Sequence, residues 1–379
     1  MATDSSAATA AASSSAAIRL EHVSKRFPGA STDAVADLSL EVRQGEVTVF
    51  VGPSGCGKTT TLKMINRLEE PTSGHIEIFG RDQAATPAHE LRRQIGYVIQ
   101  ETGLFPHRTI AENIATVPHL LGWPKARIRD RVQELAELVG LEREQLERYP
   151  ASLSGGQRQR AGVARALAAD PPILLMDEPF GAVDPIVRTR LQDELLALQQ
   201  RLHKTIVFVT HDIEEATKLG DRVAVLDVGG ILAQYAPPAE LLREPANAFV
   251  EEFLGRERGL RELSLIPVSD VPLERRCELS PGASCEEALA AMDRAGADWA
   301  LVIEDDRCAG WVDRKRIAEA VPNVSAAAVP LARWIGPNSN LREALEVALT
   351  SHTRVAIVQD GERYLGVLPI ERIAQRLEA

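Results

Sequence analysis

The stretch EVTVFVGPSGCGKTTTLKMINRL, residues 46–68, decides the fold of this chain. It joins an apolar run, typical of a buried strand, to a glycine-rich loop that a helical pattern follows. Glycine lets backbone N–H groups surround phosphate, and the helix directs its positive N-terminus at the same anion. We expect Lys58 to reach the β and γ phosphates and the Thr59 hydroxyl to ligate Mg²⁺. The other residues predicted to contact the nucleotide are Gly52, Pro53, Ser54, Gly55, Cys56, Gly57 and Thr60.

A second apolar run, Ile173–Met176, ends at the acidic pair Asp177 and Glu178. Acidic residues often terminate strands, but the carboxyl end of a parallel strand is also where ligands bind in open α/β sheets. Combined with the phosphate loop, the pair predicts that Asp177 holds Mg²⁺ through water. It also predicts that Glu178 polarises the attacking water as a general base.

The string LSGGQ, residues 153–157, opens a further helical segment. The Ser154 side chain and the amides of Gly155 and Gly156 predict another anion-binding helix start. A helix cap with a glycine turn is the local alternative, and the two roles are compatible. The string, which ends at Gln157, therefore predicts a second γ-phosphate site and leaves open which subunit that site faces.

With these three motifs, residues 18–257 resemble the nucleotide-binding subunit of an ABC transporter. The resemblance implies an α/β fold, a P-loop ABC ATPase domain with a RecA-like core, a β subdomain and a helical subdomain. It also implies a homodimer that encloses two ATP molecules with Mg²⁺, in which the LSGGQ string of each copy completes the site of the other. In that dimer Lys58, Thr59 and the opposing Ser154 would neutralise charge on the γ-phosphoryl group.

Four further residues match positions of that family. Phe27 matches the aromatic residue that stacks on adenine, where tyrosine is commoner. Gln100 matches the glutamine that contacts Mg²⁺ and the attacking water, and Asp184 matches the loop that communicates across the dimer. His211 matches the histidine that contacts the γ-phosphate. The chemistry suits each role, because a ring can stack, an amide can ligate a cation, and a histidine at a strand end can donate to phosphate.

Regions of different texture follow one another along the chain. Residues 1–17 are nearly all alanine, serine and threonine, and we expect a disordered leader because so little apolar surface cannot offset the entropy of ordering. Residues 18–257 alternate strand-like and helical patterns, and residues 101–165 are expected to be mostly helical. The charged residues 258–263 are expected to form a linker. The predicted strands of the sheet are Glu46–Val51, Ile173–Met176, Thr205–Thr210 and Arg222–Leu226.

The last part of the sequence repeats itself without a gap. Pro281 and Pro337 lie 56 residues apart, and Gly310 and Gly366 have the same spacing. A helix, a strand, a turn and a second strand recur in register around them. Such agreement across different kinds of element predicts an internal duplication.

Two longer stretches sharpen the resemblance. VIQETGLFPHRTIAENIATVPHLLGW (98–123) and LLMDEPFGAVDPIVRTRLQDEL (174–195) are similar to ATPase subunits of osmoprotectant importers, which handle glycine betaine, carnitine, choline or proline. Those subunits carry a C-terminal pair of CBS motifs, which residues 264–322 and 323–379 resemble as an α+β tandem module. The resemblance implies a separate integral-membrane permease, a separate solute-binding protein and a peripheral location at the cytoplasmic face of the cell membrane. An importer of an amino acid or another small polar solute, and a soluble ABC ATPase without a permease, are the alternatives.

The duplicated region departs from the CBS pattern that binds adenosine nucleotides. That pattern has Thr or Ser three residues after a glycine and Asp six residues after it, whereas Gly310 is followed by Asp313 and Arg316. The second copy also lacks the ribose carboxylate. Relatives are linked to sensing of ionic strength and of cyclic dinucleotides, and contact with anionic lipid is one interpretation of the basic residues 314–316. A cluster of only three charges favours the other interpretation, an ordinary solvated helix face.

Composition excludes other classes of function. The formal net charge of −11 and the pI near 5.4 argue against a nucleic-acid binder, which would carry a basic face. No run approaches the roughly 18 apolar residues that a membrane helix needs, so any membrane pathway is expected on another polypeptide. Four cysteines without a short CxxC pair are expected to be free thiols, and they are Cys56, Cys277, Cys285 and Cys308.

Overall fold

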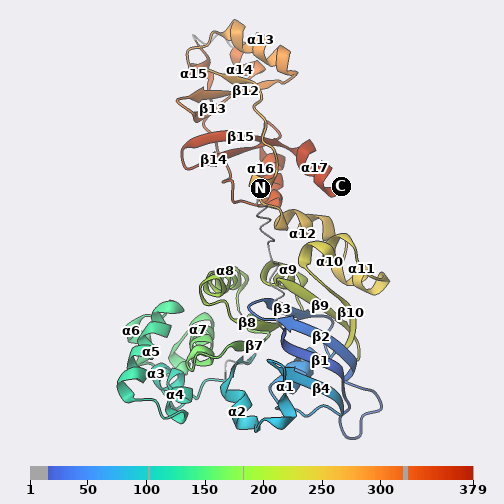
Figure 1. The fold of residues 1–379 in the computed structure, drawn as a ribbon. Coiled ribbons are helices and arrows are strands. Elements are labelled where there is room, and N and C mark those ends of the chain that lie inside the picture. Colours follow the sequence, from blue (N-terminus) through green and yellow to red (C-terminus); the bar gives the residue numbers. More distant parts are fainter. Residues whose placement is uncertain (1–15, 101–102, 182, 319–322, 379) are drawn as a thin grey trace, which may run out of the picture. The chain divides into compact units, whose positions relative to one another are not determined.

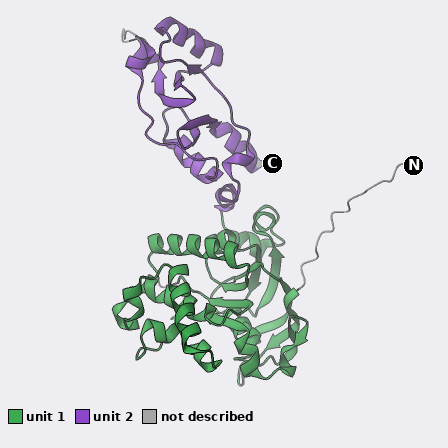
Figure 2. Ribbon diagram, turned by 60° about the vertical axis from the view of Figure 1, so that its left-hand side comes forward, with its two compact units in different colours: residues 1–255 green, residues 256–379 purple. Residues whose placement is uncertain are grey.

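Figure 1 shows the computed structural model of the chain. The structure describes residues 16–100, 103–181, 183–318 and 323–378. The chain divides into two units, Met1–Gly255 and Arg256–Ala379, and each has hydrophobic clusters of its own (Figure 2). The division falls close to the boundary predicted after residue 257.

A six-stranded sheet of order β10-β9-β3-β8-β7-β6 lies at the centre of the first unit. Its strands are β3 (Val47–Val51), β6 (Ile95–Val98), β7 (Ile173–Asp177), β8 (Thr205–Val209), β9 (Arg222–Asp227) and β10 (Ile231–Ala236). All neighbours pair in parallel except β9 and β10. β3, β7 and β8 are buried along their whole length, which explains their continuous apolar runs. The four predicted strands are confirmed, and their carboxyl ends lie at one edge of the sheet.

A second, antiparallel sheet of order β2-β1-β4-β5 completes the core of this unit. Its strands are β1 (Ala16–Lys25), β2 (Val35–Arg43), β4 (Ser73–Ile78) and β5 (Arg81–Asp82). Its buried side chains join one hydrophobic cluster with the central sheet and with helix α1 (Lys58–Ile65). Residues 1–15 of the predicted leader lie outside the described residues. The leader was wrongly extended to residue 17, because Ala16 pairs with Arg43 and Ala17 is fully buried in β1.

Helices fill the segment between β6 and β7, as the sequence predicted for residues 101–165. They are α3 (Ile110–Ile114), α4 (Thr116–Leu120), α5 (Lys125–Leu138), α6 (Arg143–Leu146) and α7 (Gly155–Leu167). Figure 1 shows α3 to α7 gathered beside the central sheet. The other helices of the unit are α2 (Ala88–Arg93), α8 (Pro185–Leu202), α9 (Ile213–Leu219), α10 (Pro238–Arg243) and α11 (Ala248–Leu254). The helical prediction is confirmed for the described residues of this segment.

The second unit contains two copies of one motif. The first copy has β11 (Glu278–Leu279), α13 (Cys285–Ala295), β12 (Trp299–Glu304), β13 (Arg307–Asp313) and α14 (Arg314–Ala318). The second has α16 (Leu341–Thr350), β14 (Val355–Asp360), β15 (Arg363–Pro369) and α17 (Ile370–Glu378), with the short helix α15 (Val324–Ala327) between the copies. β14 and β15 begin and end 56 residues after β12 and β13, at the predicted spacing.

The two copies also agree in fine detail. The antiparallel register shifts directly after Val302 in the first hairpin and directly after Val358 in the second. Ser284 caps α13 by accepting from the third helical N–H, and Asn340 caps α16 in the same way. Both pairs of residues keep the 56-residue spacing. A shared bulge and a shared cap indicate a duplicated fold, because neither is required by the hydrophobic pattern.

The segment predicted to be a linker, residues 258–263, is instead part of helix α12 (Arg258–Leu265). Leu263 of this helix is fully buried in a cluster with residues of α16 and α17. The charged residues of this segment lie on the other faces of the helix. Their high proportion led to the linker prediction, although one residue of the segment, Leu263, faces the core.

None of the helices in the described residues is both long and apolar enough to cross a membrane. The four cysteines are free thiols, and Cys56 is the buried one among them.

Candidate active site

The glycine-rich loop between β3 and α1 has a backbone that excludes side chains at two positions. Gly57 has φ +100°, and a Cβ there would lie 2.4 Å from the carbonyl oxygen of Ala34. Gly52 has φ +156°, and a Cβ there would lie 2.1 Å from the carbonyl oxygen of Leu226. A Cβ on Gly55 would meet nothing within 4 Å. The loop is therefore packed against backbone on one side and open on the other, as an anion cradle requires.

The ammonium group of Lys58 lies within this loop. Its Nζ donates to the carbonyl oxygens of Gly52 at 2.8 Å and Pro53 at 3.0 Å. The residue is only 5% exposed, and no carboxylate among the described residues pairs with it. Cys56 is fully buried, burial raises the pKa of its thiol, and Lys58 Nζ also donates to its Sγ at 3.6 Å. A positive charge held by carbonyl dipoles and not neutralised is available to an incoming anion.

The hydroxyl of Thr59 and the carboxylate of Asp177 meet beside the loop. Thr59 Oγ1 donates to Asp177 Oδ1 at 2.8 Å, which joins the start of α1 to the end of β7. Asp177 is buried, and this burial raises the pKa of its carboxyl group, with the neighbouring Glu178 charge adding to the rise. A buried carboxylate without a cation partner is costly, and a bound metal ion would relieve that cost.

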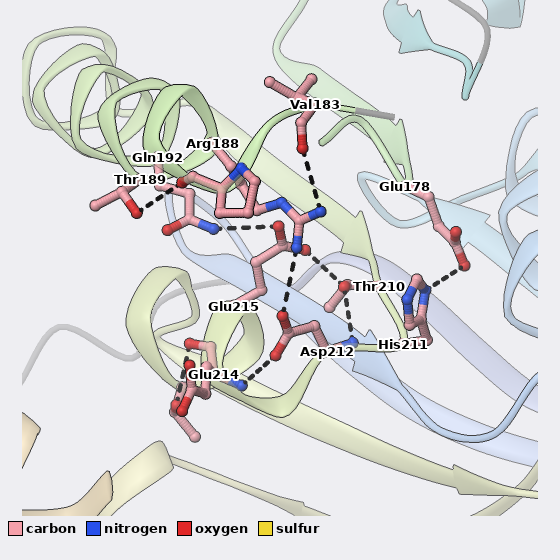
Figure 3. Close-up of polar contacts among 12 residues, drawn as sticks. Glu178, Val183, Arg188, Thr189, Gln192, Thr210, His211, Asp212, Glu214 and Glu215 are labelled. Carbon is pink, nitrogen blue, oxygen red and sulfur yellow. Dashed lines mark hydrogen bonds and ion pairs between the residues drawn. The ribbon is translucent and has the colours of Figure 1, made fainter. Parts of the chain in front are cut away.

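Two of the predicted catalytic side chains, those of Gln100 and His211, contact the third, Glu178. Gln100, after β6, donates from Nε2 to Glu178 Oε2 at 3.3 Å. His211, after β8, places Nδ1 3.3 Å from Glu178 Oε1 (Figure 3). Glu178 itself has φ +42°, a left-handed conformation that turns its side chain away from the strand direction. Three separate strand ends therefore supply one cluster of a carboxylate, an amide and an imidazole.

The LSGGQ residues form a helix start that is separate from this cluster. Ser154 caps α7 by accepting from the Gln157 N–H at 3.3 Å, while Gln157 Oε1 accepts from the Ser154 N–H at 2.9 Å. A Cβ on Gly155 would meet nothing within 4 Å, and one on Gly156 would approach Val187 at 3.2 Å. Within the described part of the chain, no hydrogen bond joins these residues to the phosphate loop. The cap that the sequence predicted is confirmed, and its exposed face is open.

Phe27 and Asp184 also lie apart from the cluster. Phe27 follows β1 and is 37% exposed, and the Lys25 ammonium lies 5.0 Å from the centroid of its ring. Asp184 is exposed and caps α8 by accepting from the Ile186 N–H at 3.0 Å. Both side chains remain accessible to a ligand or to a second chain.

A buried polar network behind His211 was missed by sequence reasoning (Figure 3). Glu215, in the first turn of α9, accepts from the Thr210 hydroxyl at 2.6 Å and from Gln192 Nε2 at 3.1 Å. Thr210 Oγ1 also accepts from the Asp212 N–H at 3.0 Å. The only sequence signal was the pair of glutamates after His211, which reads as an ordinary acidic first turn of a helix.

The site fits a nucleotide with Mg²⁺. The cradle excludes side chains and is open at Gly55, and it contains the cation of Lys58. The ligands beside it are oxygen atoms of Thr59 and Asp177, the type that Mg²⁺ prefers. The described residues contain no group of three or more His, Cys, Asp or Glu side chains that would hold a metal alone. Proteins bind Mg²⁺ through one or two carboxylates together with substrate phosphates, and Asp177 supplies such a carboxylate.

Comparison with known proteins agrees with this geometry. The family model described as ABC transporter matches residues 35–181. The osmoprotectant import ATP-binding protein OsmV of Salmonella typhimurium is 46% identical over 369 residues, which cover 96% of each chain. The chain belongs to the ABC transporter family. It is an ATP-binding protein of that family.

Two more comparisons place the chain within the ABC transporter family. The choline transport ATP-binding protein OpuBA of Bacillus subtilis is 44% identical, over 94% of this chain and 92% of the relative. Among solved structures, the dimeric post-hydrolysis state of the ATP-binding cassette MJ0796 bound to ADP and Pi matches with a TM-score of 0.53 and 33% identity. That match covers 58% of this chain and 98% of the solved chain. The ABC cassette fold of the first unit is thus established.

Proposed function

We propose that the chain hydrolyses ATP to drive import of an osmoprotectant of the glycine betaine, choline, carnitine or proline class. Two kinds of observation support this. The observation that carries hydrolysis is the convergence of Gln100 and His211 on the Glu178 carboxylate at 3.3 Å each, next to the Thr59–Asp177 pair. The solute class rests on the relatives named for osmoprotectants and choline, which match over more than nine-tenths of the chain.

Glu178 acts as the general base in this proposal. Its carboxylate takes the proton from a water molecule, whose oxygen attacks the γ-phosphorus of ATP. The bond from that phosphorus to the bridging oxygen breaks, and ADP and phosphate leave. Gln100 orients the water and contacts Mg²⁺. His211 faces Glu178 with Nδ1, and its other ring nitrogen, Nε2, is the atom that contacts the γ-phosphate.

The phosphate loop binds and neutralises the triphosphate. Backbone N–H groups of residues 52 and 54–60 surround the phosphates, and Lys58 supplies the positive charge. Thr59 and Asp177 would hold Mg²⁺, which would supply charge neutralisation to the triphosphate. Phe27 stacks on the adenine ring, for which its exposed face is suited.

Two copies of the chain form the working unit in this proposal. Ser154, Gly155, Gly156 and Gln157 of one copy bind the γ-phosphate held by the other, and Asp184 lies in the loop between the two sites. The open face of the α7 N-terminus and its lack of bonds to the phosphate loop support a partner in trans. The dimeric, ADP-bound and Pi-bound cassette among the structural matches supports the same arrangement.

The partners that we propose are an integral-membrane permease and a separate solute-binding protein, with the ATPase at the cytoplasmic face of the membrane. The alternative solute is another small polar molecule, such as an amino acid. One observation favours that alternative, since a spermidine/putrescine import ATP-binding protein, PotA of Rubrobacter xylanophilus, is 41% identical over 85% of this chain. A soluble ABC ATPase without a permease is disfavoured, because these three relatives are all described as import or transport proteins.

The second unit is proposed to be a tandem CBS module that regulates transport. The support is its duplication at 56 residues, with the same bulge and the same helix cap in each copy. A cyclic dinucleotide or an anionic lipid is the proposed class of signal. The lipid is the weaker of the two, because Arg314 already pairs with Asp293 at 2.7 Å and Arg316 lies 3.9 Å from Asp313. These pairs favour a solvated helix face for residues 314–316.

The test is uptake of radiolabelled glycine betaine at low and high osmolarity. Cells that lack this gene and every redundant betaine importer are complemented with wild type or with Glu178→Gln. Salt-stimulated uptake that only wild type restores would establish both the ATPase role and the solute class. Equal uptake in the uncomplemented cells and in both complemented strains would remove the osmoprotectant assignment and leave the ATPase assignment standing. Purified Glu178→Gln protein is expected to bind ATP but to lose about a hundredfold or more in turnover, and unchanged turnover would refute the general base.

A further inference from the structure

Glu215 is a buried acid for which the described mechanism has no use. It is 5% exposed, and no lysine, arginine or histidine among the described residues forms an ion pair with it. Burial raises the pKa of its carboxyl group, so the site disfavours the negative charge. A buried carboxylate costs more folding stability than an apolar side chain of similar size. We therefore expect its hydrogen bonds to have a role in function.

The bonds of Glu215 join three elements at the edge of the sheet. One oxygen accepts from the hydroxyl of Thr210, the residue that follows β8, at 2.6 Å. The other accepts from Gln192 of α8 at 3.1 Å, and Glu215 itself belongs to α9 (Figure 3). The carboxylate therefore fixes the strand end against two helices at once.

His211 lies between two residues that this network fixes. Thr210 donates its backbone N–H to the Phe50 carbonyl at 3.1 Å and its hydroxyl to Glu215, so both its backbone and its side chain are held. Asp212 donates its N–H to Thr210 Oγ1 and caps α9 by accepting from the Glu214 N–H at 2.8 Å. The imidazole is 58% exposed and has few contacts of its own, so the backbone turn sets its position.

We propose that Glu215 is a positioning residue for ATP hydrolysis, which sets the backbone turn that presents His211 to Glu178 and the γ-phosphate. This inference rests on the proposed hydrolysis at this site. In this proposal Glu215 acts through Thr210. A displacement of about 1 Å at a group that contacts the transferred phosphate costs roughly a hundredfold in rate. Glu215 is expected to affect turnover and not the binding of ATP by the phosphate loop.

The experiment measures steady-state ATP hydrolysis by the full-length protein. Glu215→Ala is expected to lower kcat roughly tenfold to a hundredfold with KM for ATP changed less than about threefold. Glu215→Gln is expected to keep kcat within about threefold of wild type, because its carbonyl oxygen still accepts from Thr210 and Gln192 can turn its amide. Thr210→Val keeps the shape of the side chain and removes the hydroxyl, so it should lower kcat in the same way even if Glu215→Ala fails to fold.

Two controls separate positioning from a merely structural role. Glu214→Ala removes the exposed neighbouring acid of the same helix and should leave kcat unchanged. In a His211→Ala background, Glu215→Ala should add no further loss, because the group that it positions is gone. Additive losses, a change in KM alone, or wild-type turnover in folded Glu215→Ala would overturn the inference. Absence of hydrolysis in the wild-type protein would overturn the proposed function together with this inference.

Discussion

Replacement of Gly57 by alanine tests whether the phosphate loop depends on its backbone conformation. The new Cβ would lie 2.4 Å from the Ala34 carbonyl oxygen and 3.0 Å from Val35 Cγ2, on a residue with φ +100°. The left-handed backbone costs an L-residue about 1–2 kcal/mol. The backbone of Ala34 cannot rotate away as a side chain can, and relief of the overlap costs a further ~1–3 kcal/mol. The sum is about 2–5 kcal/mol, and each 1.4 kcal/mol is roughly tenfold in an equilibrium constant.

This cost must appear in one of two measurements. If the loop moves to admit the methyl group, ATP affinity measured by calorimetry falls; if the loop stays, the thermal unfolding temperature of the first unit falls. The matched control is Gly55→Ala, because Gly55 has φ +81° and open space around the added Cβ. That variant should show only the backbone cost of about 1–2 kcal/mol. Equal affinity and stability for the two variants would refute the argument that the overlap with Ala34 matters.

Three further outcomes are expected. Ser154→Ala should lower turnover but leave ATP affinity of the isolated chain unchanged, whereas Ser154→Asn should preserve α7 because asparagine is an equally good helix cap; circular dichroism and ATP titration separate the two effects. Burial raises the pKa of Glu215, so the folded protein holds that proton more tightly than the unfolded chain and loses stability as pH rises above about 4. Glu215→Gln should therefore be more stable than wild type at pH 7 and no more stable below about pH 4, as chemical denaturation would show. Residues 256–379 expressed alone should unfold cooperatively, and a chain that lacks tertiary structure by near-ultraviolet dichroism would contradict a separate unit.

The parts of the site that depend on short sequence motifs could be predicted from the sequence. An apolar strand, a glycine-rich loop and a helix, in this order, predict the geometry around Lys58. The structure has β3, the loop and α1 in the same order. The strand ends at Asp177 and His211 follow from the parallel sheet, whose carboxyl ends lie on one edge. The approach of Gln100 and His211 to Glu178 also follows from the parallel sheet, because all three residues come after strands that end at this edge. The distances between their side chains could not be predicted from the sequence.

Features that depend on tertiary packing could not be predicted. The direction of Lys58 toward the carbonyl groups of its own loop is set by the loop conformation. The linker prediction for residues 258–263 failed because a high density of charge concealed the one face of α12 that Leu263 buries. Glu215 escaped notice because an acid in the first turn of a helix is ordinary, and only the fold brings Gln192 and Thr210 to it.

Helix α8 connects two parts of the site that the sequence treats as separate. Its first turn is capped by Asp184, and Arg188 donates to the Val183 carbonyl at 3.4 Å, so the helix holds the loop that precedes it. Arg188 also lies 3.8 Å from Asp212, and Gln192, four residues later, holds Glu215. Residues four apart lie on one face of a helix, so both contacts with the turn around His211 come from the same face. In the proposed dimer, a second chain that contacts Asp184 would therefore be linked through α8 to the turn that holds His211.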